Sequence, residues 1–557
     1  MVNSSKPWLK HYPEGVPHDL GPLGHSSLSD FMDECFERFA SRRAIEAMGS
    51  FFTYDEINCL SKNFASYLAT LNLEKGSRVA LMYPNVIEYL VAMVGTLRAG
   101  YTVVNINPLY TSRELESQLQ DSGATVLVLM ENFASTYEQI LPQAAIKTVI
   151  VSSPGELLGL KGYVINWVAR HIKKIVAPWD FKHIKMKDAL RIGFNRPFVK
   201  ASIGLDDVAF LQYTGGTTGV SKGAVLLHRN ILSNVMQIEA WLNPGLKQQH
   251  TDQLVLLCAL PMTHIFALTA CALLGIAKGS LLILVPNPRD ITGFIKMLIK
   301  HPNINIFPGV NTLFHALIHR PEFKSVKLPN LLVTIGGGMA VHKKTADHWQ
   351  ALTGSPIAQG YGLSETSPVV CVNSPLEDRF TGHIGSPIPG TDVVILDDDE
   401  VVVPQGAIGE ICIKGPQVMA GYWNKPDESQ NCMTADGYFK SGDIGLITSE
   451  GYIQIVDRKK DMIVVAGFKV FPNDVEDVIV QMPGIQECAV IGEPHRKLGE
   501  IVKVYAVRSN HHITEAAVLQ YCREHLTSYK RPRKVIFVNE LPKSNVGKIL
   551  RRELRNI

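Results

Sequence analysis

A run of glycines and hydroxyl side chains around one lysine is the part of the sequence best suited to chemistry. It comprises Tyr213, Thr214, Gly215, Gly216, Thr217, Thr218, Gly219, Ser221 and Lys222. The glycines let the backbone approach a polyanion closely, and the hydroxyls and the lysine add donors and positive charge. It is not a Walker A loop, because no glycine directly precedes Lys222. A glycine-rich surface turn is the alternative, but turn chemistry does not explain so many hydroxyls beside one lysine.

Two further glycine-rich stretches carry aromatic or charged side chains. The first comprises Gly336, Gly337 and Gly338, and the second Gln359, Gly360, Tyr361, Gly362, Glu365 and Thr366. A glycine run at the end of a strand allows a flat ring to lie against the backbone. Glu365 suits Mg²⁺, which usually binds one or two carboxylates together with phosphate oxygens. Taken alone, Glu365 is more simply a solvated loop residue.

Charged residues near the end of the chain form a third group. Asp443 ends the stretch GYFKSGD, and Arg458 and Lys460 follow in DRKKD. A carboxylate suits two vicinal hydroxyls, because it can only accept hydrogen bonds. Lys548, in LPKSNVGK, could stabilise negative charge in a closed site. The simpler alternatives are a surface ion pair for Asp443 and Arg458, and a solvated cation on a basic helix for Lys548.

These motifs, in this order, resemble those of the adenylate-forming superfamily of acyl-CoA synthetases, luciferases and nonribosomal peptide adenylation domains. The resemblance covers residues from about 28 to 555. It implies that the first run embraces the β- and γ-phosphates of ATP and that Thr218 and Glu365 hold Mg²⁺. The nucleotide contacts that it implies are Gly336 to Gly338 and Tyr361 at adenine, Gln359, Gly360 and Gly362 beside them, Thr366 at the α-phosphate, Asp443 and Arg458 at the ribose, and Ile455. It also implies that Lys460 is a hinge and that Lys548 bridges the attacking carboxylate and the α-phosphate.

The two other substrates, the acid and the thiol that accepts the acyl group, are indicated by a resemblance to one branch of this superfamily. Residues 436–476 resemble the signature segment of fatty acyl-CoA synthetases, and the likeness to bacterial long-chain enzymes extends to residues 8–17 and 105–119. It implies that Ala466, Gly467 and Phe468 flank the pantetheine tunnel. It also implies an acyl pocket gated by His264 and lined by Phe307, Val310, Asn311 and Gly338, although a lone histidine in an apolar stretch can be an ordinary core residue. Only nine residues follow Lys548, so free coenzyme A is expected rather than an attached carrier.

We therefore expect a long-chain fatty acid–CoA ligase that uses ATP, Mg²⁺ and coenzyme A, with Lys548, Thr218, Glu365 and His264 as catalytic residues. A ligase for aryl or medium-chain acids is one alternative. A catalytically silent protein that binds nucleotides or contacts membranes is another. A silent protein need not keep Lys222, Glu365, Asp443, Arg458 and Lys548 together.

The elements that must position these residues are read from periodicity. Short β-branched runs at 78–83, 102–106, 125–130 and 148–153 alternate with helical patterns, as in βαβ units with a largely parallel sheet. From about Asp392, two strands separated by an acidic turn leave no room for a crossover helix, which predicts an antiparallel or barrel-like subdomain at about 390–457. The expected fold is α/β, with a large N-terminal domain over 1–457 and a small mobile α+β C-terminal domain over 458–557.

Composition limits the other classes of protein to which this chain could belong. Of 557 residues, 46% are hydrophobic and 19% charged, which is typical of a folded globular protein. The net charge of +3 argues against a nucleic-acid binder. Nine scattered cysteines without a C-x-x-C pair indicate neither a zinc ribbon nor a disulfide framework. The N-terminus lacks an apolar signal region, so a cytoplasmic protein is expected, and the sequence leaves open whether the chain forms a homodimer.

One segment carries a possible membrane contact. Within residues 157–187, Leu160, Val164, Val168, Ile172 and Val176 share one helical face, with Lys161, Arg170, Lys173 and Lys174 nearby. Such a helix could rest on the anionic inner face of a membrane as a peripheral contact. The alternative is an ordinary surface helix packed on the core.

Overall fold

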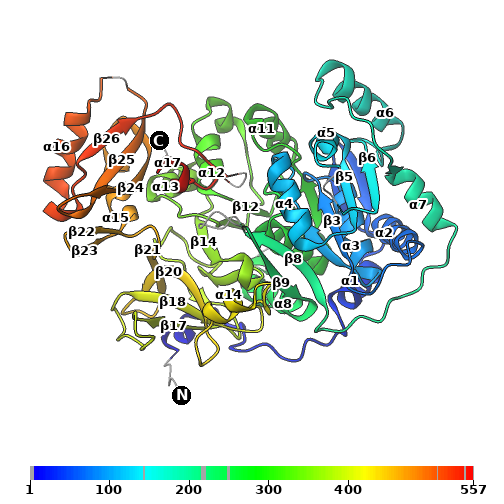
Figure 1. Cartoon of the computed structure of the whole chain (residues 1–557), viewed down its shortest axis with the longest axis horizontal. Coiled ribbons are helices and arrows are strands. Elements are labelled where there is room, and N and C mark those ends of the chain that lie inside the picture. The colour runs from blue at the N-terminus through cyan, green and yellow to red at the C-terminus, as the bar shows by residue number, and fades with distance from the viewer. Residues whose placement is uncertain are drawn as a thin grey trace.

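The structure, a computed structural model, describes residues 6–141, 145–214, 221–247, 251–510, 512–544 and 547–555. Its large N-terminal part contains two extended sheets (Figure 1). The nine-stranded sheet has the order β16-β15-β14-β13-β12-β10-β11-β1-β2, with bounds β1 (Arg43–Ala47), β2 (Ser50–Thr53), β10 (Val255–Cys258), β11 (Leu281–Leu284), β12 (Ile306–Gly309), β13 (Val333–Gly336), β14 (Ile357–Gly362), β15 (Val369–Val372) and β16 (Ser386–Pro387). The eight-stranded sheet has the order β19-β9-β8-β4-β3-β5-β6-β7, with bounds β3 (Arg78–Met82), β4 (Thr102–Asn105), β5 (Val126–Met130), β6 (Thr148–Ser152), β7 (Ile184–Lys185), β8 (Val208–Thr214), β9 (Lys222–Leu227) and β19 (Gly421–Tyr422).

The centres of both sheets are parallel, as the alternation of strand and helix patterns predicts. β3 pairs in parallel with β4 and β5, and β12 and β13 continue a parallel run to β14. Antiparallel pairs occur toward the edges, where β8 meets β9 and β14 meets β15. The four strands predicted between residues 78 and 153 are confirmed as β3 to β6.

Helices cover the sheets because successive strand residues point to opposite faces. In β3, Val79 and Leu81 join the main core, whereas Ala80 and Met82 join a second cluster on the other face. The helices of this part are α1 (Leu28–Arg38), α2 (Tyr54–Ala69), α3 (Ile87–Arg98), α4 (Ser112–Ser122), α5 (Ala134–Glu138), α7 (Met186–Phe194), α8 (His228–Leu246), α9 (Ile265–Ala267), α10 (Leu274–Lys278), α11 (Ile291–Lys300), α12 (Asn311–Ile318), α13 (Lys343–Thr353) and α14 (Pro426–Asn431). Shorter turns are η1 (Pro7–His11), η2 (Glu131–Phe133), η4 (Leu268–Leu273), η5 (Pro321–Ser325) and η6 (Ser364–Thr366).

An antiparallel sheet follows the two large ones, as predicted from the strand–turn–strand pattern. Its order is β17-β18-β20-β21, with bounds β17 (Asp392–Leu396), β18 (Gly409–Lys414), β20 (Phe439–Ile447) and β21 (Ile453–Arg458). In the register of β20 and β21, Asp443 lies opposite Arg458. This sheet therefore brings together two of the charged residues that the sequence singled out.

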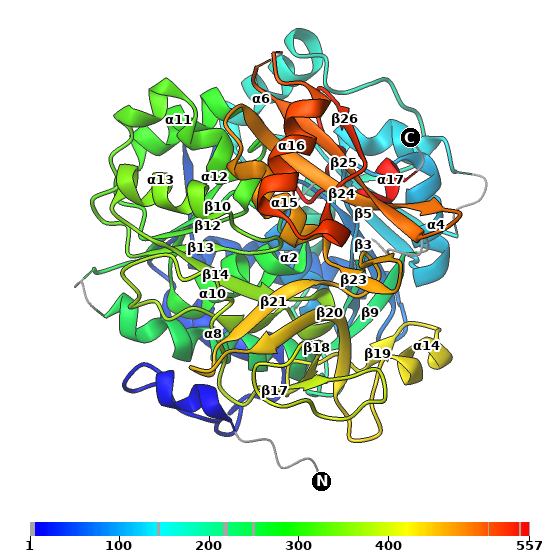
Figure 2. The ribbon, with the colours of Figure 1, turned by 90° about the vertical axis from the view of Figure 1, so that its left-hand side faces the viewer.

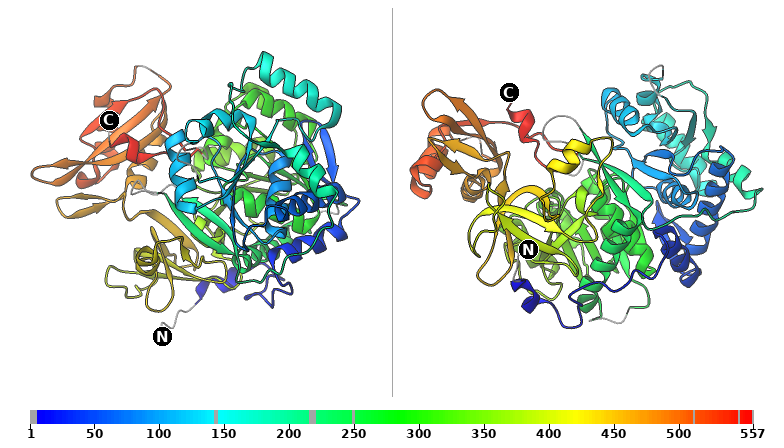
Figure 3. Two further views of the ribbon diagram at one scale, coloured as in Figure 1. Left: turned by 45° about the vertical axis from the view of Figure 1, so that its right-hand side comes forward. Right: turned by 60° about the horizontal axis from the view of Figure 1, so that its bottom comes forward.

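The C-terminal part forms a separate five-stranded sheet with its own hydrophobic core. Its elements are β22 (Ile463–Val465), β23 (Phe468–Val470), α15 (Pro472–Gln481), β24 (Ile485–His495), β25 (Gly499–Arg508), α16 (Glu515–His525), η7 (Ser528–Lys530), β26 (Lys534–Phe537) and α17 (Arg551–Leu554). Figures 2 and 3 show this part, coloured orange to red, beside the yellow four-stranded sheet. The α/β class with a smaller C-terminal domain is confirmed, and the division at residues 457 and 458 stays a prediction.

The predicted amphipathic segment forms α6 (Gly159–Trp167), which continues into a π-helical turn, η3 (Val168–Ile172). Its apolar face points to solvent: Leu160 is 87% exposed, Val164 63% and Ile172 62%. The segment also packs on the core, since Gly162 and Ala169 are buried and Ile165 contacts the main core, so it is a surface helix that presents further apolar side chains to solvent. No helix within the described ranges is long and apolar enough to cross a bilayer.

Candidate active site

A cavity of about 1390 Å³ lies between the large sheets, the four-stranded sheet and the last residues of the chain. Its wall includes the carboxyl ends of β12, β13 and β14, which are parallel neighbours. Parallel strands end at the same sheet edge, so residues from three distant segments meet there. These residues are Val310, Gly337, Gly338, Gln359, Gly360, Tyr361 and Gly362.

The predicted ribose-binding pair lies in one wall of this cavity. Arg458 Nε is 3.0 Å from Asp443 Oδ1, and the Tyr361 hydroxyl donates to Asp443 Oδ2 at 2.7 Å. Asp443 is only 3% exposed, and its charge raises the pKa of Arg458, which stays cationic. Ile455 and Lys460, from the same stretch of chain, also line the cavity. Burial lowers the pKa of Lys460 to about 8.

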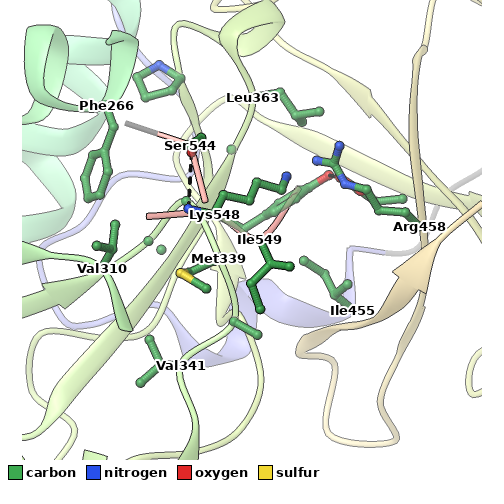
Figure 4. Close-up of a pocket in the computed structure, with 18 of the residues that line it drawn as sticks. Phe266, Val310, Met339, Val341, Leu363, Ile455, Arg458, Ser544, Lys548 and Ile549 are labelled. Carbon is green, nitrogen blue, oxygen red and sulfur yellow. Dashed lines mark hydrogen bonds and ion pairs between the residues drawn. The ribbon is translucent and has the colours of Figure 1, made fainter. Parts of the chain in front are cut away.

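Lys548 reaches the same cavity from the end of the chain, with its side chain extended toward Arg458 (Figure 4). Its backbone N–H donates to Ser544 Oγ at 3.2 Å, and its carbonyl accepts from the Ser544 N–H at 2.8 Å. Gly547 has a φ of +79°, and a Cβ there would collide with the Thr312 hydroxyl, so this loop docks on α12 only with glycine. Burial lowers the pKa of Lys548 to about 7, and the charge of Arg458 adds to this.

Gly215, Gly216, Thr217, Thr218 and Gly219 of the predicted phosphate loop lie outside the described residues. The strands on either side pair with each other, with Thr214 opposite Lys222, and both of these residues line the cavity. The described residues that flank this stretch therefore lie at the cavity wall.

The two residues at the loop ends differ in what they contact. Lys222 forms an ion pair with Glu428 of α14, and its Nζ lies 5.3 Å from the ring centre of Tyr422. Tyr213 lines the cavity, but its hydroxyl donates to Asp121 Oδ2 at 2.6 Å. The Tyr213 hydroxyl is thus engaged by the protein itself.

Glu365, the predicted magnesium ligand, is buried at the turn after β14 and lines the cavity. Its Oε1 accepts a hydrogen bond of 2.8 Å from the Tyr422 hydroxyl, and its backbone carbonyl accepts one of 2.8 Å from the Met419 N–H. Burial raises the pKa of Glu365. Tyr422 thus stands between Glu365 and Lys222, two residues that the sequence placed in separate motifs.

Thr366 and Gly336 lie behind the cavity wall. Thr366 is fully buried, and its hydroxyl accepts from the Leu363 N–H at 3.0 Å and donates to the Pro368 carbonyl. Gly336 pairs with Gly309 inside the sheet. Their predicted contacts with the nucleotide remain predictions.

The predicted acyl-pocket residues divide into two groups. His264, Val310 and Gly338 line the cavity, and burial lowers the pKa of His264 to about 4, which leaves a neutral imidazole at pH 7. Phe307 packs in the core, with its ring centre 5.0 Å from that of Trp349. The Asn311 Oδ1 accepts a hydrogen bond of 3.0 Å from the backbone N–H of His342, just before α13. Neither Phe307 nor Asn311 is among the described residues that line the cavity.

An apolar extension of the cavity is lined by residues that the sequence did not single out. They are Ile238, Trp241, Leu242, Leu260, Ala270 and Val372. The Trp241 Nε1–H donates to the Asn373 carbonyl at 3.1 Å, which fixes the indole. Periodicity identifies α8 as a partly buried helix, but it cannot tell which buried residues face a cavity rather than packed core.

Ala466, Gly467 and Phe468 lie at the β22–β23 turn, and none of them lines the cavity in this structure. Ala466 and Gly467 have φ values of +51° and +86°. Phe468 is 57% exposed and stacks on Tyr529 with ring centres 4.8 Å apart. In this orientation of the C-terminal part, Lys548 faces the cavity and the β22–β23 turn does not.

The sequence analysis also missed three polar residues: Tyr422 and Arg551, which line the cavity, and Glu428, which pairs with Lys222. Arg551 lies in the basic run after Lys548, but it is largely buried and pairs with Glu476 at 2.8 Å. The apolar residues Ile549 and Leu554 within that run were an available signal of a half-buried helix. Tyr422 and Glu428 carry no local signal, because their roles arise only from contacts across the fold.

Comparison with known proteins decides the family. Residues 32–423 match the AMP-binding enzyme family, and residues 474–548 match the AMP-binding enzyme C-terminal domain. The chain belongs to the AMP-binding enzyme family. The resemblance to adenylate-forming enzymes is thereby confirmed. Lys222 and Glu365 of this AMP-binding enzyme fall in the first matched range, and Lys548 ends the second.

Curated relatives match nearly the whole chain. It is 46% identical over 554 residues to the long-chain-fatty-acid–CoA ligase of Escherichia coli O6:H1, which covers 99% of this chain and 98% of that protein. It is 30% identical over 518 residues to 4-coumarate–CoA ligase 1 of Petroselinum crispum, which covers 91% of this chain and 89% of that protein.

Among solved structures, MatB from Rhodopseudomonas palustris is similar in two states. With ATP bound, it has a TM-score of 0.83 at 29% identity, over 95% of this chain and 98% of that chain. Apo MatB, with the same identity and coverage, has a TM-score of 0.73. The arrangement of this AMP-binding enzyme is therefore more similar to that of the ATP-bound relative.

Proposed function

We propose that this enzyme is a long-chain fatty acid–CoA ligase that works through an acyl-adenylate. The observation that carries this proposal is that a single cavity joins the wall of Asp443, Arg458 and Lys548 to an apolar extension beside α8. A nucleotide and an acyl chain could thus be bound side by side. The relative from Escherichia coli, 46% identical over almost the whole chain, supports a fatty acid as the substrate.

In the first half-reaction, a carboxylate oxygen of the acid attacks the α-phosphorus of ATP. The new O–P bond gives the acyl-adenylate, while the bond from the α-phosphorus to the bridging oxygen breaks and releases pyrophosphate. Asp443, held by Tyr361 and Arg458, would accept hydrogen bonds from the ribose hydroxyls. Lys548 would offset the negative charge that gathers as the carboxylate meets the α-phosphate.

The phosphates would be held where β8 and β9 meet. Donors would come from the loop between Thr214 and Lys222, and Lys222 would exchange its ion pair with Glu428 for one with the β- and γ-phosphates. The loop itself lies outside the described residues, so its part rests on residue types alone.

The carboxylate oxygens of Glu365 are suitable ligands for Mg²⁺. This ion usually keeps several waters and binds one or two carboxylates together with substrate phosphate oxygens, so it needs no cage of protein ligands. Glu365 offers one buried carboxylate at the cavity, and the described part of the chain forms no cluster of three or more metal-binding side chains. Glu365, with Thr218, would hold the ion. When bound, the ion would neutralise charge on the departing pyrophosphate.

The acyl chain would lie in the apolar extension. Each methylene buried there contributes about 0.8 kcal/mol, so affinity should rise steadily with chain length until the space is filled. Neutral His264, at the junction with the polar wall, would admit the chain without placing a charge beside it.

In the second half-reaction, the thiol sulfur of coenzyme A attacks the acyl carbon. The acyl–phosphate bond breaks, AMP leaves, and the thiol proton passes to solvent. We infer that residues 458–557 turn about Lys460 before this step, moving Lys548 out and the β22–β23 turn with Gly467 in. Two observations support this: that turn now lies away from the cavity, and the structure is more similar to ATP-bound than to apo MatB.

The proposal is tested by product analysis. Palmitate, ATP, Mg²⁺ and coenzyme A should give palmitoyl-CoA, AMP and pyrophosphate, and formation of ADP would reject the proposal. A panel of acids from octanoate to stearate, with 4-coumarate and benzoate, separates it from the alternative of an aryl or medium-chain acid ligase. That alternative would hold if 4-coumarate or octanoate gave the highest kcat/KM.

We also propose that α6 makes peripheral contact with an anionic membrane surface. Leu160, Tyr163, Val164 and Trp167 are all more than half exposed, on a helix followed by Lys173 and Lys174. Exposed aromatic and aliphatic side chains beside lysines are typical of helices that lie in the interface of a bilayer. The helix lies on the opposite side of the molecule from the C-terminal strands (Figure 1), so contact there would leave them free to move.

Cosedimentation with vesicles tests this contact. The protein should pellet with vesicles that contain phosphatidylglycerol and remain in solution with neutral phosphatidylcholine. Leu160→Glu with Trp167→Glu should abolish binding, whereas Val401→Glu, which changes an exposed apolar residue of the loop between β17 and β18, should not. Equal binding by the double variant would refute the contact.

A further inference from the structure

Asp457 is a buried carboxylate at the point where the chain leaves the four-stranded sheet. It is 1% exposed, and its backbone pairs with Ile444 of β20. Its Oδ1 accepts from the Arg458 N–H at 2.7 Å, and its Oδ2 accepts from the Asn473 N–H at 2.8 Å. Asn473 belongs to α15, in the C-terminal part. The Asp457 carboxylate therefore spans the junction between the two parts of the enzyme.

Two more contacts cross the same junction. The Asn473 Nδ2–H donates to the Val456 carbonyl of β21 at 3.1 Å. Arg551 Nη1, from α17, lies 3.7 Å from Asp457 Oδ1. Other contacts of Arg551 do not cross this junction. They join Arg551 to residues of the C-terminal part and the hinge: Glu476 at 2.8 Å, Asn473 at 2.8 Å and Asp461 at 3.4 Å.

These two sets of contacts respond differently to a rotation about Lys460. The pairs of Arg551 with Glu476 and Asn473 would move as one body with the C-terminal part. The contacts of Asp457 with Asn473 and Arg551 would break, because Asp457 stays with the sheet. A buried carboxylate that loses its partners is costly, so these contacts favour the orientation in which they form.

The same contacts bear directly on Lys548. Arg551 lies three residues after it and begins α17, and Lys548 faces the cavity in this orientation. We propose that Asp457 is a positioning residue which, through Asn473 and Arg551, holds the C-terminal part in the orientation that places Lys548 at the reacting groups. The inference rests on the proposed function, and it adds a residue that governs the first half-reaction through the position of Lys548.

Asp457→Asn is the test, because it keeps the shape and one acceptor but removes the charge. Adenylation, measured as pyrophosphate exchange into ATP, should fall about tenfold or more, which is the scale for loss of a buried charged hydrogen bond. Transfer of the acyl group from supplied palmitoyl-adenylate to coenzyme A should change less than twofold. A merely structural role would lower both steps together, and that result, or no change in either, would overturn the proposal.

Two further variants keep the test decisive. Asn473→Ala removes the bond to Val456 and should shift the ratio of the half-reactions in the same direction, which decides the matter if Asp457→Asn does not fold. Glu487→Gln removes a 2.7 Å ion pair with Lys543 inside the C-terminal part and should leave the ratio unchanged. A shift in the Glu487 variant equal to that of the Asp457 variant would also overturn the proposal.

A distance measurement separates this inference from the proposed function. Spin labels at Val401→Cys, in the loop between β17 and β18, and at Glu524→Cys, on α16, can be placed in a Cys59→Ser background, since Cys59 is the one cysteine of the described chain that is exposed. With ATP alone, the unmodified hinge should give one dominant distance, and Asp457→Asn should broaden it or add a second. If Asp457→Asn leaves the distance distribution unchanged, the inference is overturned. If the variant changes the distribution but the unmodified enzyme forms no palmitoyl-CoA, only the proposed function is contradicted.

Discussion

The Tyr361 hydroxyl and the Asp443 carboxylate are joined by a hydrogen bond of 2.7 Å across 82 positions of the chain. The other oxygen of Asp443 pairs with Arg458 at 3.0 Å. Both carboxylate oxygens are therefore oriented before any nucleotide binds. Preorganised acceptors of this kind avoid part of the cost of ordering the site on binding.

Asp443→Asn should weaken ATP binding by about 10- to 100-fold, the scale of one charged hydrogen bond. The amide has one oxygen that accepts and one NH2 group that only donates, whereas both oxygens of the carboxylate can accept from the ribose hydroxyls. Calorimetric titration with ATP and with 2′-deoxy-ATP measures this weakening. The unmodified enzyme should favour ATP over the deoxy analogue, and the variant should discriminate less. Full discrimination in the variant would show that Asp443 does not bind the ribose.

The kcat/KM of adenylation should fall as the pH rises through about 7. Burial lowers the pKa of Lys548 to about 7, so this lysine is cationic below that pH and neutral above it. The profile of kcat/KM reports ionisations of the free enzyme. Lys548→Arg should extend the plateau to higher pH, since guanidinium stays charged. Lys548→Ala should lose adenylation at every pH but still transfer supplied palmitoyl-adenylate to coenzyme A; loss of both steps in that variant would contradict the assigned role.

Tyr422→Phe removes the hydrogen bond of 2.8 Å to Glu365. The Mg²⁺ concentration that gives half-maximal adenylation should rise about 10-fold or more, the scale of one hydrogen bond to a charged group, with kcat little changed at saturating Mg²⁺. Calorimetry of ATP binding with and without Mg²⁺ gives a readout apart from activity. Tyr438→Phe, which removes a bond of 2.8 Å to Asp392, is the matched control, and an equal effect there would reject a specific role for Tyr422.

Gly467→Leu should block thioester formation and spare adenylation, because the variant puts a side chain on the turn proposed to flank the pantetheine. Gly406→Leu is the matched control for backbone strain: its φ is +88° against +86° at Gly467, and neither has an atom within 4 Å of an added Cβ. Separate assays of the two half-reactions measure the effect. Normal palmitoyl-CoA formation by the Gly467 variant would contradict the proposed tunnel.

Much of the fold and part of the site could be predicted from residue types and spacing. Periodicity is a local property, so the strands β3 to β6 and the antiparallel pair β17 and β18 were readable in advance. The motifs around Glu365, Asp443 and Lys548 were readable for the same reason, because each requires particular residues within about a dozen positions.

What could not be read locally depends on which distant segments pack together. Burial lowers the pKa of Lys548 most, and the largest contribution from a neighbouring charge comes from Arg458, ninety positions away in the chain. Phe307 and Thr366 face the core rather than the cavity, although both lie in segments that the sequence analysis assigned to the site. Local sequence favours a backbone conformation and the chemistry of a side chain, whereas packing alone sets the direction of that side chain and the solvent around it.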